Sequence, residues 1–256
     1  MQIVPRAALF DLDETLAESF KSPLPHMIQR VHTVLSHIPC AIVTGRDFAW
    51  MEQDFLAQIT VSPHSNRFYV VAEGGAEGYS YREGAWHKEY GTRMSSEERE
   101  QIRTTISEAV QTTQALQGET IYGEQFIDKH SMVAFALIGR DVPTDLKKTW
   151  DPGNAKRHLL AKVVSEKLPQ YDVVLGGATT LDVTMHKINK AFGVQWLSKT
   201  LNIPVSEMFY VGDALYPDGN DEPVIATGIQ VRGTSGPAET EKIIDELLAS
   251  LIHATK

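Results

Sequence analysis

Residues 7–15 constrain this 256-residue chain most, because an apolar run ends there in two closely spaced carboxylates. Ala7 to Phe10 is short and apolar and follows Pro5, which predicts a buried parallel strand. Asp11 and Asp13 come next, and ligands of open α/β sheets bind outside the carboxyl ends of the strands. Two neighbouring carboxylates repel each other, so one must meet a metal ion or carry a proton. The pair therefore predicts a nucleophile held by a cation beside an acid/base, with a solvated turn or helix cap as the alternative.

The charge and the cysteine content narrow the class of protein. A formal net charge of −9 argues against a nucleic-acid partner and against an anionic membrane surface. Cys40 is the single cysteine, so no internal disulfide can form, which fits a reducing compartment. The chain shows neither a signal-peptide pattern nor an apolar run of ~18 residues that could span a membrane. We therefore expect a cytoplasmic protein.

A second unit of strand, polar turn and helix follows the first. The apolar residues 40–43 predict another buried strand, which ends at Thr44 and leads into a helix that reaches Ile59. Its neighbours in the chain are a predicted helix at 26–37 and a predicted strand at 68–72. A hydroxyl at a helix N-terminus can help to bind an anion, so Thr44 is a candidate phosphate ligand, with a simple N-cap as the alternative.

The pattern changes in the middle of the chain. The glycine-rich residues 73–78 predict a flexible exit from the first region, and alternating side chains at 79–88 predict a β-hairpin. Ser95 and Glu98 form a capping-box pattern at the start of a polar helix. Further strands are predicted at 124–128, 132–138, 171–175 and 180–184, with a second helix around 159–168. Strands joined by hairpins predict an α+β module on an antiparallel sheet.

The strand-and-helix alternation returns at Lys187. Residues 190–201 predict a helix, and residues 208–211 predict a buried strand that ends in Gly212-Asp213. Short strands are predicted at 224–226 and 229–231, and a last helix begins at Pro237. We therefore expect an α/β protein whose Rossmann-like core carries a mostly parallel sheet and is discontinuous. The predicted bounds are 1–78 and 184–256 for the core and 79–183 for an inserted domain.

Polar side chains collect at the predicted carboxyl ends of the core strands. They are Asp11, Asp13, Thr44, Asp213 and Asp221, together with Lys190 at a helix start. Carboxylates offer the hard oxygen ligands that Mg²⁺ prefers. A lysine and a hydroxyl near a helix N-terminus suit the oxygens of a phosphate group. The set therefore predicts a magnesium site beside a phosphate site, and a small phosphorylated substrate.

The order of these motifs resembles the haloacid dehalogenase superfamily of phosphotransferases. The motifs that carry the resemblance are Asp11-Leu-Asp13-Glu-Thr15, Thr44-Gly45, Lys190, and Gly212-Asp213 with Asn220-Asp221. The insertion between the second and third motifs is similar to the type 2B cap of that superfamily. The resemblance implies a Rossmann-like core and an α+β cap that selects the substrate.

The resemblance also implies the chemical steps. Asp11 would attack phosphorus and form an aspartyl-phosphate. Asp13 would protonate the leaving oxygen and then activate the incoming nucleophile. Mg²⁺ would be held by Asp11, by the main-chain carbonyl of Asp13 and by Asp213, with Asp221 in its outer shell.

The phosphoryl oxygens would be bound by Thr44, Gly45, Lys190 and Asn220, which offset the charge that spreads over them. Asn220 is also a candidate for the outer shell of the metal. Lys187 is the competing lysine. Lys190 is preferred because it stands immediately before the predicted helix, as the third-motif lysine of the superfamily does.

Within the superfamily, the chain is similar to the eukaryotic-type phosphomannomutases and to related bacterial sugar-phosphate phosphatases. The similar segments are Arg46-Asp47-Phe48, Glu73-Gly74-Gly75, 132–140 and 176–183. The resemblance implies that Arg140, Lys129 and Asp182 contact the substrate from the cap. The chain departs from the mutase pattern where Lys129-His130 replaces Arg-Asn and Ala134 replaces Asn. An ammonium recognises an anion less specifically than a guanidinium does, so the distal part of the site is incomplete.

Three functions are open on these grounds. A Mg²⁺-dependent phosphohydrolase acting on a sugar phosphate is preferred, because an incomplete distal clamp supplies less binding energy. A phosphomannomutase-type transfer between the 1- and 6-positions of a hexose would need a cap that excludes water. A non-catalytic binder of a phospholigand would not need two crowded carboxylates. The sequence leaves the oligomeric state open; related mutases pair through their caps, so a cap-mediated homodimer is one alternative.

Overall fold

The computed structural model describes residues 4–254, which form two compact units. The first unit contains the N-terminal segment as far as Gly91, then Asn189–Pro217, and then the C-terminal segment from Asp221. The second unit contains Thr92–Ile188 and Asp218–Asn220. In the described part of the chain, no helix is both long and apolar enough to cross a lipid bilayer.

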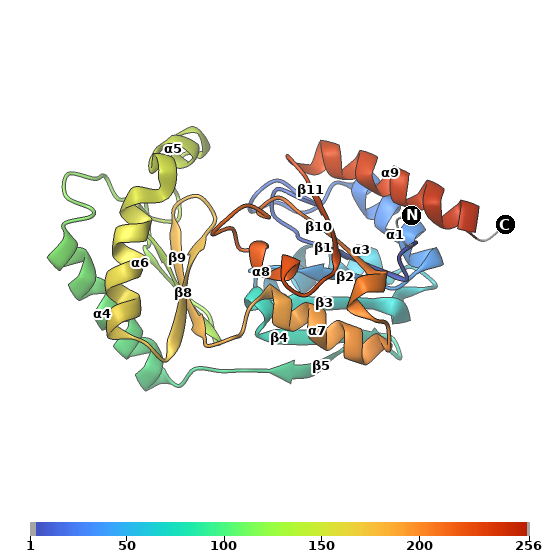
Figure 1. Cartoon of the computed structure of the whole chain (residues 1–256), viewed down its shortest axis with the longest axis horizontal. Helices are drawn as coiled ribbons and strands as arrows, with labels where there is room; N and C mark the ends of the chain where they lie inside the picture. The colour runs from blue at the N-terminus through green and yellow to red at the C-terminus, as the bar shows by residue number, and fades with distance from the viewer. Residues whose placement is uncertain (1–3, 255–256) are drawn as a thin grey trace. The chain divides into compact units, whose positions relative to one another are not determined.

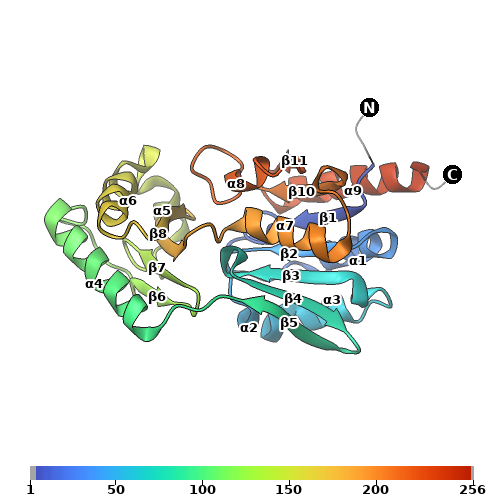
Figure 2. The ribbon, with the colours of Figure 1, turned by 60° about the horizontal axis from the view of Figure 1, so that its bottom comes forward.

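A seven-stranded sheet with the order β11-β10-β1-β2-β3-β4-β5 forms the centre of the first unit (Figure 1, Figure 2). Its strands are β1 (Ala7–Phe10), β2 (Cys40–Val43), β3 (Phe68–Ala72), β4 (Glu77–Arg82), β5 (Ala85–Gly91), β10 (Met208–Gly212) and β11 (Gln230–Gly233). The strands from β11 to β3 pair in parallel, whereas β4 and β5 are antiparallel. The predicted α/β class with a mostly parallel sheet is confirmed.

Both faces of this sheet are covered by helices because the side chains of its strands alternate. Ala8 and Phe10 of β1 face a cluster that includes α1 and α9, whereas Ala7 and Leu9 face a cluster that includes α7. The helices of this unit are α1 (Pro25–His37), α2 (Phe48–Met51), α3 (Ala57–Thr60), α7 (Lys190–Leu201), α8 (Glu222–Ile225) and α9 (Pro237–Ala254). A π-helical turn, Glu52–Leu56, joins α2 to α3, so the helix predicted up to Ile59 is present with one wide turn.

The predicted hairpin is present, but its assignment to the inserted domain is wrong. β4 pairs with β3, and the hairpin therefore extends the core sheet. The Tyr79 ring stacks on the Phe48 ring of α2, with 3.8 Å between the ring centres, and the Trp86 ring packs edge-on against Phe48, with 5.3 Å between the ring centres. These aromatic contacts pack the hairpin onto the core, whereas the sequence interpretation placed them in the cap.

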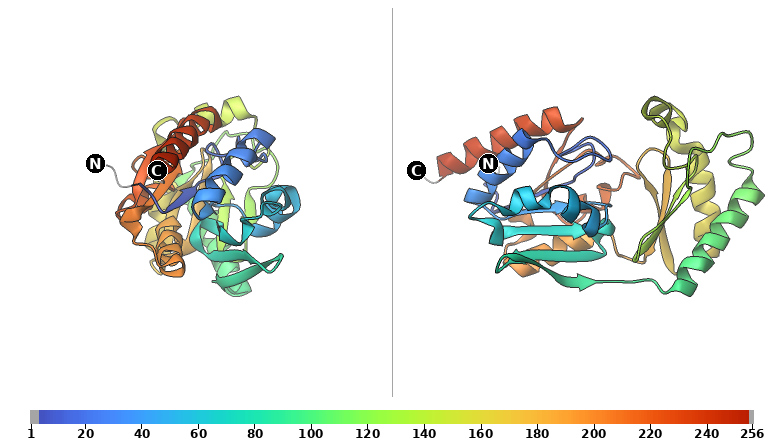
Figure 3. Two further views of the ribbon diagram at one scale, coloured as in Figure 1. Left: turned by 90° about the vertical axis from the view of Figure 1, so that its right-hand side faces the viewer. Right: turned by 180° about the vertical axis from the view of Figure 1, so that it is seen from behind.

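The second unit is an α+β module. Its antiparallel sheet has the order β6-β7-β9-β8. The strands are β6 (Phe126–Asp128), β7 (Met132–Ala136), β8 (Tyr171–Gly176) and β9 (Thr180–Met185), and the helices are α4 (Ser96–Thr113), α5 (Thr144–Thr149) and α6 (Ala155–Lys167). α4 and α6 cover one face of this sheet (Figure 3). Val133 and Phe135 of β7 and Leu181 and Val183 of β9 belong to the apolar core that this face forms with the two helices. Ser95 caps α4 through the predicted capping box with Glu98.

Two further expectations differ from the structure. The boundaries between the units fall after Gly91 and after Ile188, not at 78/79 and 183/184, because the hairpin and the end of the last cap strand were misplaced. Residues 224–226 do not form a strand: they lie in and just after α8, which has a proline in its first turn. α5 was not predicted.

Candidate functional site

The carboxyl ends of three neighbouring strands bring the predicted polar residues together. The register aligns Phe10 of β1 with Val211 of β10 and with Ile42 of β2. Asp11, Asp213 and Thr44 therefore leave their strands at the same edge of the sheet. This edge carries the candidate site of the first unit.

A buried lysine joins two of the carboxylates. The Lys190 Nζ atom lies 2.8 Å from Asp11 Oδ1 and 2.6 Å from Asp221 Oδ1. The side chains of all three residues are at most 4% exposed. Lys190 is the first residue of α7, and the Asn189 side chain caps that helix by accepting a hydrogen bond from the Phe192 N–H at 3.2 Å. The structure therefore brings Asp11, Asp221 and Lys190 together as the sequence predicts.

The start of α7 rests on the glycine motif that follows β3. Gly75 has φ +110°, and a Cβ atom there would lie 2.1 Å from the Asn189 carbonyl oxygen. Only glycine permits this approach, so the motif supports the backbone that presents Lys190. The motif, Glu73–Gly75, is a tight turn in which all three residues have positive φ, and the chain continues from it into β4 of the same sheet. Its interpretation as an exit from the core is wrong.

Asp221 is held from several sides by the protein itself. Its Oδ1 atom accepts hydrogen bonds from Lys190 and from the Tyr210 hydroxyl, and its Oδ2 atom accepts one from the Ala214 N–H at 3.0 Å. A Cβ atom on Gly212 would lie 2.3 Å from Oδ2, so the glycine leaves the space that this carboxylate fills. Tyr210 is fully buried in β10, and sequence reasoning treated it only as an apolar strand residue. A tyrosine two residues before Gly212-Asp213 in an otherwise apolar strand is the signal that was available.

Burial and crowding shift the pKa values of the acidic groups upward. Burial raises the pKa of Asp11 well above its ordinary range, and Asp221 and Asp213 raise it further, against the Lys190 ammonium. Burial, followed by the charge of Asp221, raises the pKa of Asp213 to about 6. Burial lowers the pKa of Lys190, but Asp11 and Asp221 together raise it by more, so its ammonium stays charged. The site thus holds more negative charge than one lysine neutralises.

A divalent cation fits this donor set. Asp11, Asp213 and Asp221 each offer a carboxylate oxygen, and these oxygens lie within 4.8 Å of one another. Since both oxygens of Asp221 already accept hydrogen bonds from the protein, Asp11 and Asp213 are the better first ligands. All donors are hard oxygens, which suit Mg²⁺, Ca²⁺ or Mn²⁺. A bound cation would also offset the part of the raised pKa values of Asp11 and Asp213 that comes from repulsion between the carboxylates.

The Asp13 side chain points to a different partner. Arg46 donates from Nε to Asp13 Oδ2 at 2.8 Å and from a second nitrogen to Oδ1, and the Phe20 N–H donates to Oδ1 at 2.9 Å. Thr44 is fully buried, and its hydroxyl accepts a hydrogen bond from the Arg46 N–H at 3.2 Å. Asp47, not Thr44, caps α2 by accepting from the Trp50 N–H at 2.8 Å. The N-cap alternative for Thr44 is therefore wrong.

The residues that were predicted to contact the substrate from the cap, Arg140, Lys129 and Asp182, belong to the second unit. Arg140 is 53% exposed and forms ion pairs with Asp141 and Glu124 on the surface. Asp182 lies on β9 opposite Ala134 and Val174. Burial raises the pKa of Asp182, against the Lys129 and Arg157 cations that lower it. Asp182 therefore lies within electrostatic range of both Lys129 and Arg157.

Asn220 also falls in the second unit, one residue before Asp221. Gly45 follows Thr44 at the sheet edge, and open space lies where its Cβ atom would be. The phosphate-binding roles of both residues stay predictions, as does the role of the Asp13 carbonyl in holding a metal.

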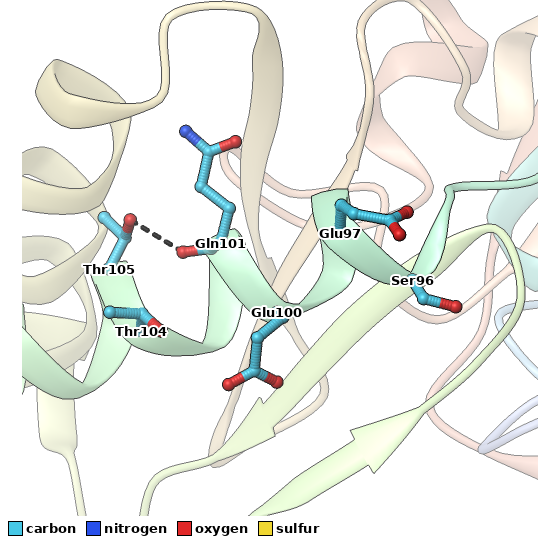
Figure 4. A pocket seen from close by; sticks show the side chains of 6 residues that line it. All are labelled: Ser96, Glu97, Glu100, Gln101, Thr104 and Thr105. Carbon is cyan, nitrogen blue, oxygen red and sulfur yellow. Dashed lines mark hydrogen bonds between the residues drawn. The ribbon is translucent and has the colours of Figure 1, made fainter.

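A surface hollow in the second unit lies along one face of α4 (Figure 4). It is lined by Ser96, Glu97, Glu100, Gln101, Thr104 and Thr105. The hydrogen bond drawn among these residues runs within the helix, from the Thr105 hydroxyl to the Gln101 carbonyl at 2.9 Å. Because every lining residue comes from a single helix, their polar groups do not converge on a ligand. The carboxylate cluster of the first unit is therefore the candidate site.

The pKa of Asp213 predicts how the stability of the metal-free protein depends on pH. The folded-state pKa of about 6 exceeds the ordinary value of 3.8, so the folded state binds more protons than the unfolded state between these values. The contribution of Asp213 to stability therefore falls as pH rises through about 6. We expect Asp213→Asn to flatten this fall, measured by urea unfolding in EDTA between about pH 5 and about pH 7.5. An unchanged pH dependence in the variant would contradict the raised pKa.

Comparisons with known proteins identify the family of the chain. A family model described as haloacid dehalogenase-like hydrolase matches residues 8–225. A phosphomannomutase of Spinacia oleracea is 23% identical over 246 residues, and the match covers 94% of this chain and 94% of that protein. A probable phosphomannomutase of Caenorhabditis elegans is 23% identical over 253 residues, with 95% of each chain covered.

Two solved structures share the fold at low sequence identity. IMP-bound IMP-nucleotidase of Plasmodium falciparum superposes with a TM-score of 0.71 and 18% identity, over 97% of this chain and 68% of that one. The C-terminal domain of C. albicans trehalose-6-phosphate phosphatase gives a TM-score of 0.67 and 16% identity, over 96% and 93% of the two chains. The family match spans most of the chain and includes all the carboxylates of the cluster. The chain therefore belongs to the haloacid dehalogenase-like hydrolases and is an enzyme.

Proposed function

We propose that the protein is a Mg²⁺-dependent phosphohydrolase that acts on a small phosphorylated metabolite through a phosphorylated Asp11. The observation that carries the proposal is the buried Asp11 carboxylate, fixed at 2.8 Å by the Lys190 ammonium and crowded by Asp213 and Asp221. A carboxylate held in this way keeps one oriented oxygen for attack.

The reaction has two balanced steps. In the first, an Asp11 oxygen forms a bond to phosphorus, the bond from phosphorus to the leaving oxygen breaks, and Asp13 gives its proton to that oxygen. In the second, Asp13 takes a proton from water, the water oxygen bonds to phosphorus, and Asp11 is released as a carboxylate. Thr44, Gly45 and Asn220 supply donors to the phosphoryl oxygens, and Lys190 offsets their charge.

Asp11, the Asp13 carbonyl and Asp213 would hold the magnesium ion, and Asp221 would orient the ligands around it. When bound, the ion neutralises charge on the phosphoryl oxygens and on the crowded carboxylates. Lys190 and Tyr210 keep Asp221 in place through hydrogen bonds, which leaves Asp11 and Asp213 as the carboxylates that would contact the ion directly.

A sugar phosphate is the substrate that we propose. The proposal is supported by the second unit, in which Asp182 could accept hydrogen bonds from sugar hydroxyls within electrostatic range of the Lys129 cation, and in which Arg140 has an exposed guanidinium. The proposal agrees with the named activities of the relatives, which act on sugar phosphates or a nucleotide. We assign the second unit, Thr92–Ile188, to the selection of this substrate.

Transfer within a hexose phosphate is the second candidate. It is favoured by the likeness to the phosphomannomutases over 94% of the chain. The register argues against it, because the residue opposite Asp182 on β7 is Ala134, whose side chain has no amide group that could bind a second phosphate. We therefore place hydrolysis first.

Hydrolysis of p-nitrophenyl phosphate tests the proposal. We expect turnover with Mg²⁺ and a loss of more than about tenfold in EDTA, because the crowded carboxylates then lack their cation. Silence in both conditions would contradict the proposal and favour a non-catalytic binder.

The mutase alternative needs its own assay. Hexose 1-phosphate is incubated with a hexose bisphosphate activator, and free phosphate and hexose 6-phosphate are measured separately. Accumulation of free phosphate supports hydrolysis, whereas accumulation of hexose 6-phosphate supports transfer.

A further inference from the structure

The Asp13 carboxylate is held by N–H donors on both of its oxygens. Arg46 Nε donates to Oδ2 at 2.8 Å, and the second Arg46 nitrogen and the Phe20 N–H donate to Oδ1. The two Arg46 contacts form a bidentate pair, which fixes the plane of a carboxylate as well as its position. The side chain of Asp13 therefore has a defined orientation although it is 32% exposed.

Arg46 is itself immobilised. Its guanidinium carbon lies 4.0 Å from the centre of the Trp50 ring and 5.0 Å from the centre of the Phe20 ring. Its N–H donates to the Thr44 hydroxyl, and its carbonyl accepts from the Glu73 N–H at 2.8 Å. The two aromatic contacts hold the guanidinium, and the two hydrogen bonds hold the backbone of Arg46. Its side chain is only 10% exposed.

The Phe20 contact comes from a strained and exposed residue. Phe20 has φ 63°, a conformation that is unfavourable for a bulky residue, and its side chain is on the surface. The loop that carries it is tied down by Glu14, which accepts hydrogen bonds from the Ser19 N–H and hydroxyl. Phe20 does not contribute to the hydrophobic core, because its side chain is exposed. Instead, its N–H donates a hydrogen bond to Asp13, and its ring lies against the Arg46 guanidinium.

We propose that Arg46 is a positioning residue that sets the orientation from which Asp13 exchanges a proton with the leaving oxygen, and that Phe20 and Trp50 hold it in place. The inference rests on the proposed role of Asp13 as the acid. Arg46 acts through Asp13 and not on the phosphate, because two of its nitrogens are already bonded to that carboxylate.

The test compares two substrates of nearly the same shape. p-Nitrophenolate leaves readily without a proton, whereas phenolate is a poorer leaving group and gains more from proton donation. The ratio of kcat/KM for the two esters therefore measures the contribution of the acid. Since kcat/KM depends only on the steps up to the first irreversible one, hydrolysis of the phosphorylated enzyme does not affect this ratio.

For Arg46→Met we expect kcat/KM to fall about 100-fold for phenyl phosphate but less than about fivefold for p-nitrophenyl phosphate. Arg46→Lys keeps the charge but loses the bidentate geometry, so its loss should be intermediate. Equal losses on both esters would overturn the inference in favour of a structural role. A rise in KM at unchanged kcat would overturn it in favour of direct substrate binding.

Two further variants separate this inference from the proposed function. Asp13→Asn should change the same ratio in the same direction. If it does not, the acid role of Asp13 fails; if it does and Arg46→Met does not, only the positioning role fails. Arg30→Met is the matched control, because Arg30 makes a comparable bidentate pair with Asp245, at 3.1 and 3.3 Å, on the surface of the same unit. It should leave the ratio unchanged.

Discussion

Replacement of Asp11 by asparagine is expected to lower kcat by about 10⁴-fold or more, the scale on which an enzyme loses its nucleophile. An amide has nearly the shape of the carboxylate but cannot form a stable bond to phosphorus. The fold should persist, because the substitution removes one of three crowded carboxylates and Lys190 keeps Asp221 as its partner. Turnover of p-nitrophenyl phosphate measures the loss, and urea unfolding checks the fold.

Asp54→Asn is the matched control for this change. Asp54 is exposed on the π-helical turn of the same unit, so the same chemical change there should leave kcat unaltered. A second readout is direct: acid quenching and mass spectrometry should find a phosphoryl group on the peptide that contains Asp11, and not in the Asp11→Asn variant. Retained turnover in that variant would contradict the nucleophile assignment.

Replacement of Lys190 by methionine is expected to destabilise the metal-free protein by about 3–5 kcal/mol. The substitution keeps the length of the side chain but leaves Asp11 and Asp221 buried without their cation. Both carboxylates then face the cost of desolvation without the attraction that offset it. The free energy of unfolding from urea titration in EDTA measures the effect, and kcat should fall as well, because Lys190 is one of the proposed phosphate ligands.

Two variants test the cause of that loss. Lys187 is exposed, so Lys187→Met should change stability by no more than about 0.5 kcal/mol. Adding Asp221→Asn to Lys190→Met should restore part of the stability, since it removes one of the two stranded charges. A Lys190→Met variant as stable as the unaltered protein would contradict the buried ion-pair network.

The elements of the fold could be predicted where hydrophobic periodicity was strong. β1, β2, β3 and α7 begin and end within a residue or two of their predicted bounds. The partners of the 77–91 hairpin could not be predicted, because its contact with Phe48 is tertiary and alternation only indicates that a strand has two faces. The helix α8 was missed because three apolar residues satisfy a strand pattern as well as a helical one.

The site could be predicted where strand ends determine position, and less well where side-chain direction matters. Asp11, Thr44 and Asp213 lie at one sheet edge because parallel strands align their carboxyl ends. The Tyr210 hydroxyl on Asp221 and the Arg46 pair with Asp13 depend on rotamers and on a strained loop residue, which no periodicity encodes. The cap residues stay the least constrained part, since they lie in the other unit.

The position of β1 in the sheet also determines when its two neighbouring strands become available during synthesis of the chain. β1 lies between β2, which follows within a few dozen residues, and β10, whose Val211 pairs with Phe10. At ~5–20 residues per second, a ribosome needs about 10–40 s to make the intervening ~200 residues. During this interval one edge of β1 has no strand beside it and is open to other chains. The whole of Thr92–Ile188 is made in the same interval, so the antiparallel sheet can close on the ribosome before Asp11 meets Asp213 and Asp221.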